Sequence, residues 1–146
     1  MTDTITKTVF LDAPREVVWS YLTEKDKLAQ WFHPADADLA PGKAYALLEK
    51  TPQGPGKPQC WGKTQTMEPP SLLVYSFTVG PLNGAMTTVT WRLEEVSGGT
   101  RLTLTHDGVA DAAGQGALPL LMALDAGWDE HFANLRPVIK ALAQAA

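Results

Sequence analysis

The sequence LDAGWDEHFANLRPVIKAL, residues 124–142, has the pattern of a long amphipathic helix near the end of the chain. Its large apolar side chains recur at spacings of three and four, which places them on one helix face: Leu124, Trp128, Phe132, Leu135, Ile139 and Leu142. Acidic residues lie toward the start and basic residues toward the end, as the helix dipole favours. Pro137 removes one backbone hydrogen bond, so we expect a kink near Ala133.

The middle of the chain alternates apolar and polar residues, the pattern of β-strands covered on one face. Residues 87–96 and 100–106 form the clearest hairpin, with a tight Ser-Gly-Gly turn between them. Further strands are predicted at 4–11, 43–50, 59–67 and 72–79. We expect a hairpin loop at 51–58, where Pro and Gly cluster, and a bulge at Gly62.

Two short helices are predicted after the first strand. Asp12 is suited to cap the first helix, with Pro14 in its first turn. The second begins after Thr23, carries Leu28, Trp31 and Phe32 on one side, and ends at Pro34. Residues 107–116 are small and flexible in composition.

This order of elements predicts one α+β domain over residues 1–146. Strands with one apolar face must bury that face against a second layer, and only the C-terminal helix is long and apolar enough to provide this layer. We therefore predict a curved antiparallel sheet of about six strands wrapped on that helix. A strongly curved sheet does not close tightly along its whole length, so we also expect an apolar cavity.

Composition narrows the range of partners and compartments. The chain has 12 basic and 16 acidic residues and no basic run, so neither nucleic acid nor an anionic membrane surface is an expected partner. No apolar run approaches the roughly 20 residues of a membrane-spanning helix. Cys60 is the single cysteine, which suits a reducing compartment, and the polar N-terminus has no signal-peptide core, so we expect a cytoplasmic protein.

The sequence contains no combination of residues that is typical of catalysis or of metal and cofactor binding. His33, His106 and His131 are not spaced as metal ligands, and Cys60 has no basic partner nearby in sequence. His106 shares a strand face with two leucines, so its ring either reaches the cavity or is a hydrogen-bonded structural histidine, and the second alternative is favoured. His131 is expected to flank the apolar stripe of the helix.

Large aromatic side chains on inward-facing positions are the remaining signal. Such rings suit flat apolar ligands, although ordinary core packing is the better explanation for any one of them taken singly. We predict that eight residues line the cavity: Trp31, Phe32, Tyr75, Phe77, Trp91, His106, Trp128 and Phe132.

Several segments, taken in order, resemble one known family. They are DAPREVVWSYLT (12–23), LAQWFHP (28–34), EPPSLLVYSF (68–77), TTVTWRLEE (87–95), GGTRLTLTHDG (98–108) and GWDEHFANL (127–135). They are similar to AHSA-type proteins, homologues of an activator of a heat-shock-protein ATPase within the START-like, or SRPBCC, superfamily. The resemblance implies a helix-grip fold with an internal cavity, but it does not fix an activity. Members of the superfamily bind lipids, hormones or polyketides, and some are cyclases or dehydratases.

Three functions follow as hypotheses. The first is binding of a small apolar or aromatic molecule in the cavity, without a cofactor. The second is a cyclase or dehydratase that uses His106 or Tyr75 as acid or base. The third is an interaction module that modulates a chaperone or another protein, and it predicts an exposed apolar patch instead of a deep pocket. A homodimer is left open.

Overall fold

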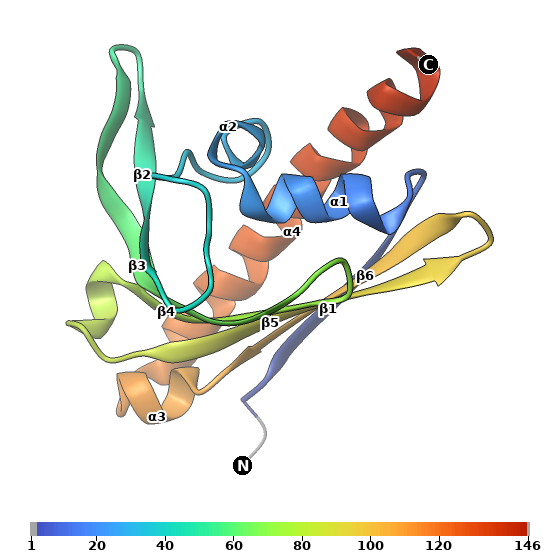
Figure 1. Cartoon of the computed structure of the whole chain (residues 1–146). Coiled ribbons are helices and arrows are strands. Elements are labelled where there is room, and N and C mark those ends of the chain that lie inside the picture. The colour runs from blue at the N-terminus through green and yellow to red at the C-terminus, as the bar shows by residue number, and fades with distance from the viewer. Residues whose placement is uncertain (1–2, 146) are drawn as a thin grey trace.

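A computed structural model describes residues 3–145 and confirms the α+β helix-grip architecture (Figure 1). One antiparallel sheet has the strand order β1-β6-β5-β4-β3-β2. Its strands are β1 (Ile5–Leu11), β2 (Ala44–Thr51), β3 (Gly54–Glu68), β4 (Leu72–Val79), β5 (Thr87–Val96) and β6 (Gly99–Asp107). The helices are α1 (Arg15–Thr23), α2 (Lys25–Leu28), the 3₁₀ turn η1 (Gly80–Leu82), α3 (Val109–Ala113) and α4 (Ala117–Ala145).

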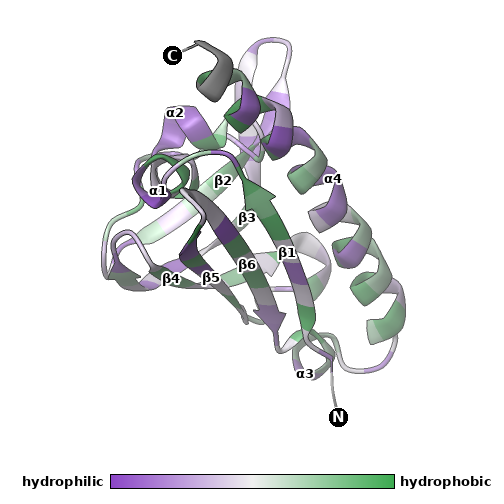
Figure 2. Ribbon diagram, turned by 90° about the vertical axis from the view of Figure 1, so that its right-hand side faces the viewer, coloured by the Kyte–Doolittle hydropathy of each residue, from purple (hydrophilic) through white to green (hydrophobic). Residues whose placement is uncertain are grey.

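The long helix α4 lies along the sheet with its apolar stripe turned inward, and hydrophobic and hydrophilic residues alternate along it (Figure 2). Trp128, Phe132, Leu135 and Ile139 are buried in the core, and the rings of Trp128 and Phe132 pack against aromatic side chains of β4, β5 and β6. The predicted apolar face of the helix is therefore confirmed for its four central residues. The prediction is wrong for Leu142, which was expected to be buried with the stripe. It is 39% exposed, because α4 extends past α1 at this end (Figure 1). Within residues 3–145, no helix has both the length and the apolar character that membrane crossing requires.

The short helices differ from the predicted boundaries. Pro14, not Asp12, is the N-cap of α1, and its carbonyl accepts the backbone N–H groups of Val17 and Val18. Helix α2 ends at Leu28, so Trp31 and Phe32 belong to the turns that follow it. Both side chains are nevertheless buried. The apolar spacing that suggested a longer helix thus reflects burial of two aromatic residues in a compact turn.

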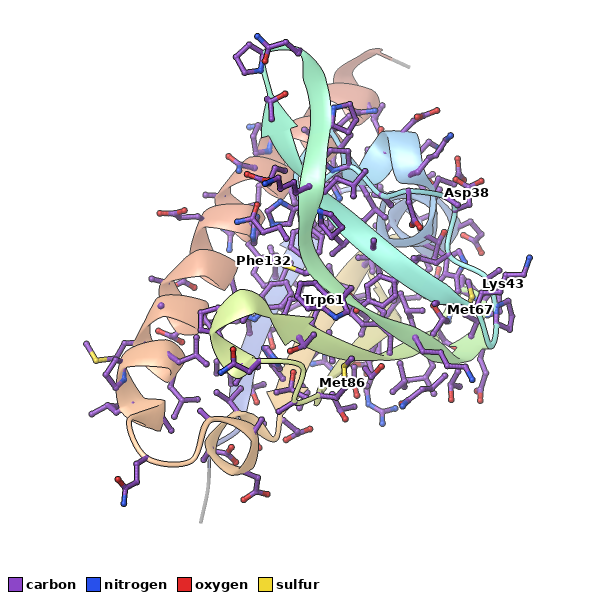
Figure 3. All side chains as sticks on the ribbon, turned by 90° about the vertical axis from the view of Figure 1, so that its left-hand side faces the viewer. Asp38, Lys43, Trp61, Met67, Met86 and Phe132 are labelled. Atoms are coloured by element: carbon purple, nitrogen blue, oxygen red, sulfur yellow. The ribbon has the colours of Figure 1, made fainter. Side chains whose placement is uncertain are left out.

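The β2–β3 hairpin is longer than predicted. Most of the expected loop at 51–58 is strand, and the turn itself is only residues 52–53. Two register shifts near Leu48 bring Pro55 and Pro58 into the pairing, so bulges accommodate prolines that cannot donate to the ladder. Trp61 is half-buried and alternates with the buried Cys60, on the outer side of β3 (Figure 3).

Gly62 is not a bulge residue. It pairs in register with Tyr45, and the β3–β4 pairing has the same register at Trp61 and at Thr64, on either side of it. A Cβ at Gly62 would lie 1.9 Å from the carbonyl oxygen of Ser76 on β4. The glycine is therefore required by the close approach of two backbones.

Candidate functional site

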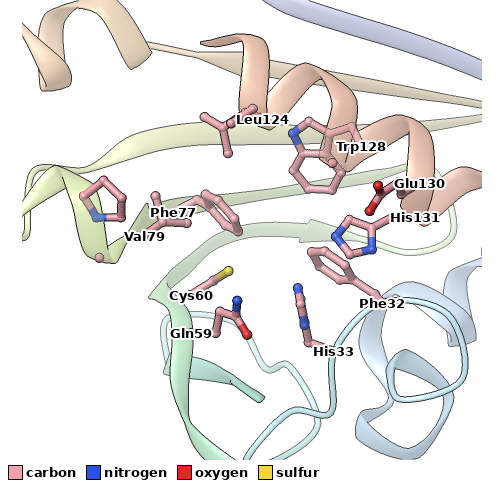
Figure 4. Close-up of a pocket in the computed structure, with 14 residues that line it drawn as sticks. Phe32, His33, Gln59, Cys60, Phe77, Val79, Leu124, Trp128, Glu130 and His131 are labelled. Carbon is pink, nitrogen blue, oxygen red and sulfur yellow. The ribbon is translucent and has the colours of Figure 1, made fainter. Parts of the chain in front are cut away.

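A cavity of about 380 Å³ lies between the first half of α4, strands β3 and β4, and the segment that follows α2 (Figure 4). Its inner surface is formed by buried side chains, namely Phe32, Cys60, Phe77 and Trp128. Its outer edge is formed by exposed residues of β3, η1 and α4: Gln59, Gly80, Pro81, Ala123 and Glu130. The cavity therefore opens to solvent between η1 and α4.

Three aromatic rings face this space. The ring centroids of Phe32 and Trp128 are 5.4 Å apart, and those of Phe77 and Trp128 are 6.0 Å apart. Figure 4 shows these rings coming from three separate elements, the turn after α2, strand β4 and helix α4. Leu124 and Val79 complete the apolar wall. The surface is suited to a flat apolar molecule, because aromatic faces stack at such distances.

The eight predicted lining residues divide into two groups. Phe32, Phe77 and Trp128 border the cavity. The other five are buried in the core and do not border it: Trp31, Tyr75, Trp91, His106 and Phe132. Several of these hold their polar atoms in internal hydrogen bonds. Trp31 Nε1 donates to the Tyr21 carbonyl at 2.8 Å, and Trp91 Nε1 donates to the Tyr75 hydroxyl at 3.0 Å.

His106 is fully buried in a row of hydrogen bonds behind the cavity, which we call the His106 row. Trp128 Nε1 donates to His106 Nδ1 at 3.1 Å, and an indole N–H can only donate, so Nδ1 is unprotonated. The neutral ring then carries its proton on Nε2, 2.8 Å from the Thr87 hydroxyl, which donates to the Phe77 carbonyl at 2.6 Å. Burial lowers the pKa of His106 to about 4, against a weaker opposing effect of Asp107. His106 is thus a satisfied structural histidine, as favoured from the sequence.

His33 and His131 form a pair that sequence reasoning missed. The two rings border the cavity, with centroids 5.0 Å apart in an edge-to-face arrangement (Figure 4). Burial, with the neighbouring His33 second, lowers the pKa of His131 to about 4. Burial and the positive charge of Lys50 lower the pKa of His33. Two features of the sequence could have indicated that these histidines lie at the cavity. His131 is three residues from Trp128 on the same helix, and His33 is adjacent to Phe32.

Cys60 contributes a neutral thiol to the cavity. Burial raises the pKa of this thiol to about 12, so it is a polarisable apolar surface and not a nucleophile at neutral pH. Among residues 3–145, no three His, Cys, Asp or Glu side chains are grouped to hold a metal ion. The cavity thus offers aromatic surfaces and, at one side, two imidazole rings.

Comparison with known proteins places this geometry in a family. The model of the family described as "Activator of Hsp90 ATPase homolog 1-like protein" matches residues 12–140. No curated protein matches the chain by sequence.

Solved structures show the same fold at low sequence identity. DynU16, a protein from the dynemicin biosynthetic locus, has a TM-score of 0.76 at 21% identity, over 96% of this chain and 48% of its own. The chain thus spans about half the length of DynU16. CalU16 from Micromonospora echinospora has a TM-score of 0.73 at 26% identity, over 97% of this chain and 79% of its own. An HSP90 activator from Plasmodium falciparum has a TM-score of 0.73 at 21% identity, over 94% and 96%.

The family match covers most of the chain, and its residues include the turn after α2, the strands and the part of α4 that together enclose the cavity. The chain belongs to the family of proteins like homolog 1 of the activator of Hsp90 ATPase.

Proposed function

We propose that the protein binds a small molecule with an apolar, preferably aromatic, body in the cavity between the sheet and α4. The observation that carries this proposal is the solvent-open cavity of about 380 Å³ with Phe32, Phe77 and Trp128 on its inner surface. Its volume falls within the range of roughly 300–1,000 Å³ that is usual for ligand pockets. Membership of a helix-grip family supports the same use of the space.

The His106 row supports binding because it fixes one wall of the cavity. The Trp128 N–H points toward His106, so the indole presents its ring and not its polar edge to the cavity. A ring held in place before binding loses little conformational freedom when a ligand stacks on it. The site is therefore preorganised for a flat molecule.

Binding is testable with 1-naphthamide, a neutral bicyclic probe. We expect it to quench tryptophan fluorescence and to raise the melting temperature, since a ligand at about 100 times its Kd stabilises the native state by ~2.7 kcal/mol.

Leu124→Trp places a larger side chain in the cavity wall, and it should weaken naphthamide binding by about tenfold or more, because bulk at this position occupies ligand space.

Met122→Trp is the matched control. Met122 lies on the same helix, is 64% exposed and does not border the cavity, so this variant should bind naphthamide like the parent protein. The proposal is abandoned if neither naphthamide nor a panel of fatty acids and aromatic molecules changes the fluorescence or melting temperature. Native mass spectrometry of the purified protein would then identify any molecule that co-purifies.

The cavity favours binding over the cyclase or dehydratase alternative. The two candidate acid–base groups, His106 and Tyr75, are buried outside the lining. Both ring nitrogens of His106 are engaged by Trp128 and Thr87, and the Tyr75 hydroxyl accepts a hydrogen bond from Trp91. A general acid or base must reach the substrate by hydrogen bond, which these positions do not allow.

Interaction with a chaperone is a second candidate, favoured by one surface feature. Leu118 and Met122 are one turn apart on α4 and are 66% and 64% exposed, which leaves an apolar strip at the start of the helix. If this strip binds Hsp90, Leu118→Asp should remove the heat of binding in calorimetry while the fold and naphthamide binding persist. Unchanged Hsp90 binding by that variant would exclude the strip as the contact.

A further inference from the structure

Two imidazole side chains, those of His33 and His131, lie together at one side of the cavity. His33 lies in the segment after α2, His131 on α4 and Lys50 on β2. The two imidazoles are in edge-to-face contact and both border the cavity. The positive charge of Lys50 acts on both rings. Two separate elements thus bring imidazole groups together beside an aromatic surface.

We propose that the cavity ligand carries an anionic oxygen group, a carboxylate or a phenolate, which accepts a hydrogen bond from His33 or His131 with its aromatic body against Phe32 and Trp128. This inference rests on the proposed function, since it names the class of molecule that the same cavity accepts. Phe32 connects the two parts of the site: its ring centroid is 4.5 Å from that of His131 and 5.4 Å from that of Trp128. A flat ligand on these rings brings its polar end to the imidazoles.

The electrostatics of the site favour an anion. The titratable and charged groups facing the pair are Lys50 from β2, the neutral Cys60 thiol from β3 and the exposed Glu130 from α4. Burial and Lys50 oppose a positive charge on both imidazoles, and His33 opposes it on His131, where a backbone hydrogen bond to Trp31 has a smaller opposite effect. A bound anion supplies the counter-charge, so an imidazole takes up one proton from solvent as the anion binds: an N–H bond forms on the ring, and no bond between heavy atoms is made or broken. The charged pair then makes a strong hydrogen bond.

Proton uptake gives this proposal a specific signature. The carboxylic acid 1-naphthoic acid and the amide 1-naphthamide share one ring system and are close in size, and only the acid is ionised between pH 5 and pH 7. We expect the Kd of naphthoate to rise by up to about tenfold per pH unit across this range, because binding is linked to one proton. The Kd of naphthamide should be nearly constant. Isothermal titration calorimetry in two buffers of different ionisation enthalpy measures the proton directly.

Three variants locate the effect. His131→Gln and His33→Gln should each weaken naphthoate binding by about tenfold at pH 5.5, the factor expected for one charge-assisted hydrogen bond, with a smaller change for naphthamide. Lys50→Gln should weaken naphthoate less and leave its pH dependence in place. Lys43→Gln is the matched control, because it removes the same charge on the side of the molecule opposite α4 (Figure 3).

The two proposals fail in different ways. If neither probe binds, both the proposed function and this inference are refuted. If naphthamide binds and naphthoate binds no more tightly at any pH, the cavity is a binding site but the anion assignment is overturned. The comparison of the two probes on the unaltered protein decides this point even where a histidine variant does not fold.

Discussion

Replacing Gly62 with alanine is expected to lower the free energy of unfolding by about 3 kcal/mol or more, the upper range for forced overpacking. The added Cβ would lie 1.9 Å from the Ser76 carbonyl oxygen and 2.6 Å from its carbon, and both are backbone atoms of the neighbouring strand. No side-chain rotation relieves such a contact, so β3 must move away from β4. Because Cys60 and Gln59 on β3 border the cavity, the same movement should also weaken naphthamide binding.

Gly127→Ala is the control for this prediction. Gly127 lies inside α4, and a Cβ there would have no neighbour within 4 Å. Alanine should therefore stabilise the helix by about 0.5–1 kcal/mol, the usual difference between the two residues in a helix interior. Urea unfolding followed by circular dichroism measures both variants. A Gly62→Ala protein within 1 kcal/mol of the parent would show that the two backbones separate more easily than the close contact suggests.

Acid is expected to remove about 3 kcal/mol of stability through His106 alone as the pH falls from 6.5 to 4. The folded protein holds this ring neutral, with its pKa lowered to about 4 by burial, whereas the unfolded chain protonates it near 6.5. Between these two pH values the unfolded state binds more protons, so stability increases with pH. The contribution is complete above pH 6.5 and is lost as the pH falls toward 4.

His106→Gln separates this effect from the titration of carboxylates and of His131. Glutamine does not titrate, and its amide has an acceptor for Trp128 and a donor for Thr87. The difference in unfolding free energy between the two proteins should change by about 1.2 kcal/mol per pH unit between pH 4.5 and 6. Parallel stability curves for the parent and the variant across this range would refute the burial of a neutral His106.

Local periodicity explains why the sheet and α4 could be predicted from the sequence. The β5–β6 hairpin has a strict alternation and a Ser97–Gly98 turn with positive φ at both residues, so the pattern and the turn agree. The spacing of Trp128, Phe132 and Leu135 likewise determined the buried face of α4. Each of these signals lies within one element and needs no knowledge of its neighbours.

The cavity could be predicted only in part, because alternation gives the face of a strand and not the depth of a side chain. Tyr75 and Phe77 are two residues apart on the same face of β4, yet only Phe77 borders the cavity while Tyr75 is enclosed in the core. The difference depends on where α4 crosses the sheet. The contact between His33 and His131 depends on the same crossing, so no spacing along the chain reveals it.

The His106 row also provides a way to observe the cavity from within. It joins four elements, α4, β6, β5 and β4, and its two ends, Trp128 and Phe77, are the same residues whose rings face the ligand space. The indole proton of Trp128 and the Nε2 proton of His106 therefore exchange with water only when α4 moves away from the sheet. Their exchange rates in nuclear magnetic resonance spectra measure how often this wall of the cavity opens, and a ligand that closes the space should slow both together.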